Sequence, residues 1–136
     1  MSVFVDTSAL LAVLDADDEF HPPARRTWED LLQRAEDLFC SSYVLVECVA
    51  LVQHRLGMAA VRALVEDILP VMRVHWVAPE EHEAAVSALL TAGRRDLSLV
   101  DCVSFDSMRR LGMLDAFAFD QDFADQGFRL MGRELR

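Results

Sequence analysis

Four acidic residues of the chain occupy positions where a carboxylate could do chemistry. Glu47 is the only charged residue in the apolar stretch at residues 43–52, YVLVECVALV. An ionised carboxylate among apolar neighbours is costly unless a cation or hydrogen bonds compensate for it. Asp6 and Asp120 each follow a short apolar run typical of a strand, SVFV and AFAF, and Asp101 opens another apolar segment.

Taken singly, each of these acids has a structural explanation. Asp6 and Asp120 suit the N-cap position of a following helix or turn. Ser98 and Asp101 match the S-x-x-[DE] capping box, in which the acid accepts a hydrogen bond from a free backbone N–H. Glu47 would be a glutamate at the edge of an apolar helix face, since glutamate is seldom fully buried.

Taken together, the four acids indicate a metal-dependent reaction if they converge on one cleft. Their mutual repulsion would then require a divalent cation, and an all-oxygen ligand set favours Mg²⁺ or Mn²⁺ over zinc. One or two such ions can lower the pKa of a bound water and stabilise an in-line displacement at phosphorus. Sequence spacing alone does not establish that the acids meet, so capping and catalysis both stay open at this point.

The elements that must position these acids alternate along the chain. Short β-rich runs separate segments of helical periodicity, a pattern typical of an α/β fold with a mostly parallel sheet of about four to five strands, covered on both faces. In such sheets, ligands bind beyond the carboxyl ends of the strands, where Asp6 and Asp120 are expected. Strands are predicted at 2–5, 38–40, 71–77, 116–119 and 128–131, and helices at 7–14, 24–36, 42–57, 58–69, 79–92 and 99–111.

Length and composition narrow the class of protein. The 136 residues correspond to one domain, residues 1–136, large enough for one hydrophobic core. Three isolated cysteines predict reduced thiols in a cytoplasmic protein, because no pair has the spacing of a zinc site. The sequence predicts no secretory signal, and its longest apolar stretches are too short to span a membrane. The net charge of −10 leaves no general basic surface for loose binding of nucleic acid.

Four motifs together resemble those of PIN-domain ribonucleases, and in particular the toxins of VapBC toxin–antitoxin pairs. They are V-D-T-S-A-L at 5–10, V-E-C at 46–48, L-S-L-V-D-C-V-S-F at 97–105 and A-F-A-F-D-Q-D-F at 116–123. The resemblance spans essentially the whole chain, and its most specific part is the last third. It implies a PIN-like three-layer α/β/α fold and cleavage of RNA with Mg²⁺ or Mn²⁺.

The same resemblance assigns roles to individual residues. Asp6, Glu47, Asp101 and Asp120 fall on the four acidic positions of the family and are the expected catalytic and metal-binding residues. Accessory roles are implied for three further residues: a hydroxyl at Thr7 or Ser8 would order the first aspartate, and Asp122 would lie near the site as an additional acid. Asp96 and Asp125 are weaker candidates. No residue is assigned as general base.

The resemblance also implies partners. RNA would be held by local arginines such as Arg94, Arg95, Arg109 and Arg110, which could equally be ordinary solvated surface. A VapB-like antitoxin would insert a basic segment into the acidic site and pack against residues near Trp28, Leu31 and Leu32 or near Leu56 and Val61, although core packing explains those residues too. A homodimer is expected on the same ground. Two alternatives stay open: a stand-alone housekeeping PIN ribonuclease, and a non-catalytic PIN-like module that binds RNA or protein.

Overall fold

The centre of the protein is a sheet of five strands, seen in a computed structural model that describes residues 1–132. The strands are β1 (Ser2–Val5), β2 (Asp37–Ser41), β3 (Arg73–His75), β4 (Asp115–Phe117) and β5 (Arg129–Met131). Their order is β3–β2–β1–β4–β5, and every neighbouring pair is parallel. Val3, Phe4 and Val5 of the middle strand are fully buried, as expected for a strand covered on both faces.

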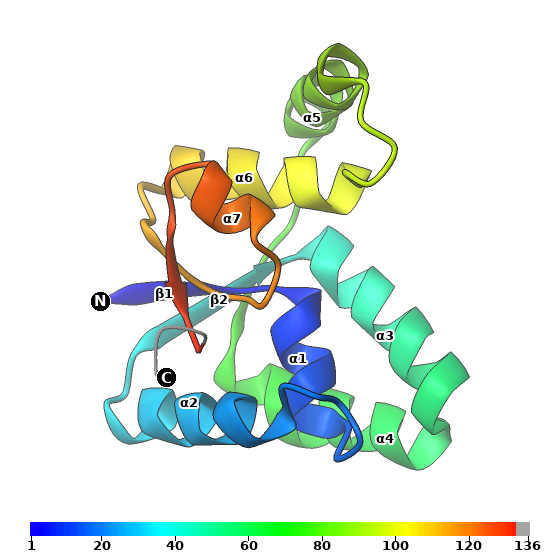
Figure 1. The fold of residues 1–136 in the computed structure, drawn as a ribbon, viewed down its shortest axis with the longest axis vertical. Coiled ribbons are helices and arrows are strands. Elements are labelled where there is room, and N and C mark those ends of the chain that lie inside the picture. Colours follow the sequence, from blue (N-terminus) through cyan, green and yellow to red (C-terminus); the bar gives the residue numbers. More distant parts are fainter. Residues whose placement is uncertain (133–136) are drawn as a thin grey trace.

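Helices cover both faces of this sheet, which confirms the three-layer α/β/α prediction (Figure 1). Helices α6 and α7 lie on one face, with α5 packed on the outer side of α6, and α1, α2 and α4 lie on the other face. The helix α3 leaves the end of β2 and contacts both α1 and α6. The helices are α1 (Thr7–Leu14), α2 (His21–Gln33), α3 (Ser42–Leu56), α4 (Met58–Ala63), α5 (Pro79–Ala92), α6 (Leu99–Leu111) and α7 (Asp122–Asp125).

The segment from residue 58 to residue 77 differs from the prediction of one helix and one long strand. The α4 helix ends at Ala63, and a π-helical turn (Leu64–Ile68) and a 3-10 turn (Leu69–Val71) follow it. Pro70 lies in the 3-10 turn and ends the helical path as its sequence position predicts, because it has no N–H to donate to the carbonyl of residue 66. The earlier change to a π-helical turn after Ala63 has no local explanation in the sequence. The strand is correspondingly short, Arg73–His75, because the chain enters the sheet only after these turns.

The fourth strand ends earlier than its apolar sequence predicts. The strand prediction reached residue 119, but the sheet pairing stops at Phe117, whose carbonyl accepts a hydrogen bond from the Asp6 N–H at 3.0 Å. The next N–H groups turn away from β1, and that of Phe119 donates to the Ser8 hydroxyl oxygen at 3.0 Å. The Ser8 side chain of α1 thus accepts the hydrogen bond that a neighbouring strand would otherwise accept from the Phe119 N–H.

The remaining predictions about the core agree with the structure. Cys40, Cys48 and Cys102 are buried and unpaired in disulfides. Trp28 and Leu31 belong to the hydrophobic core, which confirms the core explanation for these two residues. No helix within residues 1–132 has both the length and the hydrophobicity that crossing a membrane requires.

Candidate active site

Two acidic residues meet where adjacent strands end. Asp6 directly follows β1, and Asp120 follows β4 after two further apolar residues. Because β1 and β4 are parallel neighbours, their carboxyl ends open at the same edge of the sheet. The chain passes from β1 to β2 on one side and later returns to β4 on the other, and such a switch point is where α/β sheets bind ligands.

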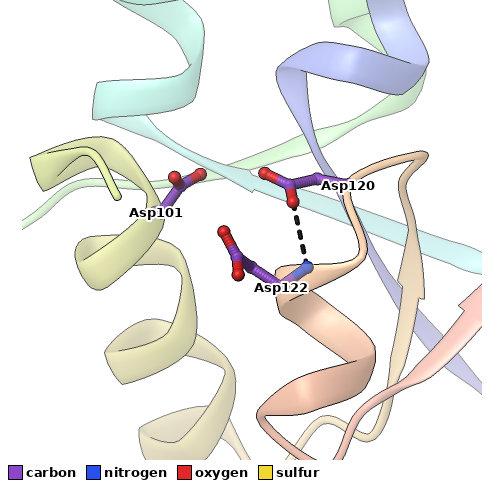
Figure 2. A group of neighbouring side chains, drawn as sticks. All are labelled: Asp101, Asp120 and Asp122. Carbon is purple, nitrogen blue, oxygen red and sulfur yellow. Dashed lines mark hydrogen bonds between the residues drawn. The ribbon is translucent and has the colours of Figure 1, made fainter. Parts of the chain in front are cut away.

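Three carboxylates form a compact cluster at this edge, here called the acidic trio: Asp101, Asp120 and Asp122. One oxygen from each lies within 4.8 Å of the others, and all three side chains are half-buried. Figure 2 shows Asp101 reaching in from α6 while the other two come from the segment that starts α7. The Asp122 N–H donates to Asp120 Oδ1 at 2.9 Å, which holds these two residues together.

Helix capping and membership of the cluster are compatible. Asp101 accepts a hydrogen bond from the Ser98 N–H at 3.1 Å, and its own N–H donates to Ser98 Oγ at 3.0 Å, which completes the predicted capping box. Asp6 is likewise the N-cap of α1 and accepts from the Ser8 N–H at 3.2 Å. Since each cap uses one carboxylate oxygen, it fixes the side chain and leaves the other oxygen to face the site.

Asp6 is the most buried of the acids, with 5% of its surface exposed. Burial raises its pKa from the usual 3.8 to about 7, and the charges of Asp101 and Asp120 contribute in the same direction. Two hydrogen bonds from Ser8 oppose the rise, and the one from its hydroxyl is 2.7 Å long. Asp6 is therefore close enough to the acidic trio for the charges of Asp101 and Asp120 to raise its pKa, although it is not one of the three.

The two predicted hydroxyl residues behave differently. Ser8 donates its hydroxyl proton to Asp6 Oδ2 and accepts from the Phe119 N–H, so it connects α1 to the end of β4. Thr7 is buried, and its Oγ1 has no hydrogen-bond partner within residues 1–132. Ser8 is therefore the hydroxyl residue that orders Asp6.

Glu47 lies on α3 at the margin of the site and is half-buried. It is not one of the acidic trio, but its charge is among the causes that raise the pKa of Asp101, after burial and the charge of Asp120. It also lines an open, mostly apolar hollow of about 300 Å³, together with Tyr43, Val46 and Val100. The structure thus places Glu47 beside the acids, with one wall of its surroundings apolar.

The arginines near the site are not equivalent. Arg94, in the connection between α5 and α6, donates to Asp122 Oδ1 at 3.1 Å and to both oxygens of Asp96. Arg110 pairs with Asp106 on its own helix. Arg95 is exposed and has no charged partner within the described part of the chain. Asp96, one of the weaker candidates, therefore serves as a partner of Arg94 outside the acidic trio.

The donor set of this site suits a hard divalent cation. Its ligand atoms are carboxylate oxygens, which Mg²⁺ and Mn²⁺ prefer. Among residues 1–132 no cysteine sulfur belongs to this cluster of ligand atoms, and Cys40, Cys48 and Cys102 are buried. The raised pKa values of Asp6 and Asp101 reflect carboxylates crowded in a partly dry space. A bound cation would relieve that crowding.

The family model of the PIN domain matches residues 3–129, which include every acid of the site. The chain belongs to the PIN-domain family. It is similar to the 23S rRNA-specific endonuclease VapC20 of Mycobacterium tuberculosis, with 37% identity over 127 residues that cover 93% of this chain and 95% of the relative.

Solved structures of PIN proteins agree with the fold. The crystal structure of Mycobacterium tuberculosis VapC20, described as a Sarcin-Ricin loop cleaving toxin, superimposes with a TM-score of 0.82 at 34% identity, covering 93% of this chain and 95% of that one. FitAcB from Neisseria gonorrhoeae superimposes with a TM-score of 0.71 at 15% identity, covering 98% and 99% of the two chains. At that identity the second likeness concerns the fold alone.

Sequence reasoning underrated two features of this PIN site. The sequence predicts Asp122 only as an accessory acid, whereas its carboxylate lies in the acidic trio with Asp101 and Asp120. Its signal in the sequence is the spacing D-Q-D, which lets the second acid bond back to the first through its own N–H. The contact of Arg94 with Asp122 spans 28 residues, so no local pattern could have revealed it.

Proposed function

We propose that this chain is a divalent-metal-dependent endoribonuclease and the toxin of a type II toxin–antitoxin pair. The single observation that carries the catalytic part is the acidic trio at the carboxyl edge of the sheet, bordered by Asp6 and Glu47. Membership of the PIN family and the 37% identity to a named rRNA endonuclease support the substrate class.

In this proposal Asp101, Asp120 and Asp122 hold Mg²⁺ or Mn²⁺, with Asp6 and Glu47 as further ligands, directly or through water. A cation held by these carboxylates would supply activation of a water and stabilisation of negative charge on the phosphate. Ser8 keeps Asp6 oriented through its 2.7 Å hydrogen bond, and Ser98 does the same for Asp101. The helix caps thereby hold the carboxylates in place before substrate arrives, which lowers the reorganisation that catalysis requires.

RNA must be held by particular positively charged side chains, because the net charge of −10 repels a polyanion. Arg95 is the best placed, since it is exposed beside Arg94 and is not neutralised by a described acid. Arg109 is a second candidate: among the described residues it donates to the backbone and side-chain oxygens of Gln126 and lies over the Phe128 ring. It is eight residues beyond Asp101 on α6, a separation of about 12 Å along the helix. The two arginines would contact phosphates on either side of the scissile bond.

The first RNA to test is the large ribosomal RNA, because the similar protein is named for it. Purified chain is incubated with 23S rRNA and Mg²⁺ or Mn²⁺, and new ends are mapped by primer extension. Cleavage at one site that is abolished by Asp101→Asn and Asp120→Asn, with folding intact by circular dichroism, is the expected result. Asp125→Asn is the matched control, since Asp125 is an exposed acid of α7 outside the acidic trio. Full activity of Asp101→Asn would refute the assignment.

The proposed partners are a VapB-like antitoxin and a second copy of the chain. An acidic site attracts a basic segment, and the half-buried Leu56 and Val61 with the exposed Leu32 offer apolar contacts for the rest of an antitoxin. For the homodimer, the supporting feature is the apolar hollow in which Val46 is 67% exposed. The three buried thiols suit the reducing conditions of the cytoplasm, where we expect the protein to act.

Both alternatives differ from this proposal in a measurable way. A housekeeping PIN ribonuclease would cleave RNA but have no antitoxin encoded beside it, so the neighbouring reading frame separates the two. A non-catalytic binding module is disfavoured, because a cluster of carboxylates weakens the binding of a polyanion unless a cation neutralises it. Such a module would bind RNA at least as well after Asp120→Asn, because one repelling charge is removed, and would never cleave it.

A further inference from the structure

One arginine stands directly beside the acidic trio. Within residues 1–132, Arg94 is the only arginine that forms an ion pair with one of the three acids, through Nη2 to Asp122 Oδ1 at 3.1 Å. The Asp122 side chain is only 14% exposed, whereas that of Arg94 is 45% exposed. The guanidinium therefore covers Asp122 from the solvent side.

Arg94 is itself held from the outside. Asp96, whose side chain is 77% exposed, accepts from Arg94 Nε at 3.2 Å and from Nη2 at 3.1 Å. A two-point contact of this kind fixes the plane of the guanidinium as well as its position. Hydrogen bonds then run without a break from Asp96 through Arg94 and Asp122 to Asp120, the last through the Asp122 N–H.

The consequence concerns the two oxygens of Asp122. Oδ1 is occupied by Arg94, while Oδ2 accepts no hydrogen bond from the described residues. The carboxylate is thereby prevented from turning, and one oxygen is left for a cation shared with Asp101 and Asp120. Partners of this kind behind a metal ligand typically change metal affinity or activity by about 10- to 100-fold when removed.

We propose that Arg94 is a positioning residue of the acidic site: it holds Asp122 in the orientation that completes the cation site, and Asp96 holds Arg94 in place. This inference rests on the proposed function, because it gives a role to a contact of the same carboxylate cluster. It differs from the expectation that Arg94 binds RNA, since Nε and Nη2 of its guanidinium donate to Asp96 and Asp122.

The sign of one measurement separates positioning from simple charge. A guanidinium repels a divalent cation, so removing it would strengthen Mn²⁺ binding if Arg94 acted only through its charge. If Arg94 positions Asp122, removing it weakens Mn²⁺ binding instead. The two explanations therefore predict opposite changes.

The experiment is a calorimetric titration of Mn²⁺ into the full-length wild type, Arg94→Gln, Arg94→Lys and Asp96→Asn. We expect Kd to rise about 10-fold or more for Arg94→Gln. For Arg94→Lys and Asp96→Asn, Kd should rise less, because lysine keeps a charged donor and asparagine keeps an acceptor. Arg62→Gln is the matched control, since it removes an exposed arginine of α4 from its ion pair with Glu66 in the following π-helical turn, and it should leave Kd unchanged.

A double-mutant cycle tests whether Arg94 acts through Asp122. In the Asp122→Asn background, Arg94→Gln should cause no further loss of Mn²⁺ affinity, whereas independent effects would add. RNA cleavage gives a second readout: at saturating Mn²⁺, Arg94→Gln should lower kcat and leave KM for RNA unchanged. Arg95→Gln, which removes a proposed phosphate contact, should raise KM instead.

Each contrary outcome has a distinct meaning. Unchanged or tighter Mn²⁺ binding by folded Arg94→Gln overturns the positioning role while leaving the proposed function intact. Additive losses in the double mutant overturn it as well. If the wild type binds no Mn²⁺, the metal site of the proposed function fails, and the role of Arg94 fails with it.

Discussion

Burial of Asp6 predicts that the metal-free protein loses stability as the pH rises. Its pKa is raised from the usual 3.8 to about 7, chiefly by burial. The folded state therefore holds the proton more tightly than the unfolded chain does. This contribution is fully present below about pH 4, is lost as the pH rises to 7, and is constant above that.

Asp6→Asn removes this penalty, because asparagine is neutral at every pH and still accepts hydrogen bonds from Ser8. A shift of about three pKa units corresponds to about 4 kcal/mol of unfolding free energy. The advantage of Asp6→Asn over the wild type should therefore grow from roughly 2 kcal/mol at pH 5 to about 4 kcal/mol at pH 8. For a domain of this length the larger figure corresponds to a rise in Tm of roughly 15 °C.

The assay is urea unfolding of wild type and Asp6→Asn at pH 5, 6.5 and 8, with a chelator present. Asp125→Asn serves as the control, since an exposed acid should give the same difference from wild type at each pH. Adding Mn²⁺ at pH 8 should narrow the difference, because it stabilises the folded state of the protein that binds it, and should reverse the order only above about 1,000 times Kd. A wild type at least as stable as Asp6→Asn at pH 8 without metal would show that Asp6 is solvated or compensated, contrary to its burial.

Further expectations concern protons, hydroxyls and assembly. At pH 6 Asp6 is mostly protonated, so Mn²⁺ binding should release its proton, whereas at pH 8.5 the proton is already lost. The release is measured as a binding heat that varies with the ionisation enthalpy of the buffer. Equal proton release at the two pH values would argue against Asp6 as a ligand. Ser8→Ala should cost about 1–2 kcal/mol in urea unfolding, because it removes the bonds to Asp6 and from Phe119, whereas Thr7→Val should not destabilise, since Thr7 Oγ1 is buried without a described partner. Val46→Asp should convert a dimer to a monomer in light scattering if the apolar hollow is the interface, and a wild type that is monomeric at high concentration contradicts that interface.

Part of the site follows from local rules. Asp6 after SVFV is the end of a buried strand, and the Ser98–Asp101 spacing predicts a capping box that the structure contains. Local rules were weaker where backbone and side chains compete. Apolar periodicity favours one helix over 58–69, whereas the chain changes to a π-helical turn after Ala63. The apolar run of β4 favours a strand to residue 119, whereas the Phe119 N–H donates to Ser8 Oγ.

Residue type and spacing by themselves determined the alternation of strands and helices, the caps, and the candidate acids, because these depend on neighbours a few residues apart. Tertiary structure alone decided which acids have carboxylate oxygens within 4.8 Å of one another and which arginine contacts them. Asp101 and Asp120 come together only because α6 lies close to the segment that follows β4, and Arg94 meets Asp122 only because the α5–α6 connection reaches the start of α7. These contacts depend on the packing of distant segments, and no period or motif within the sequence encodes them.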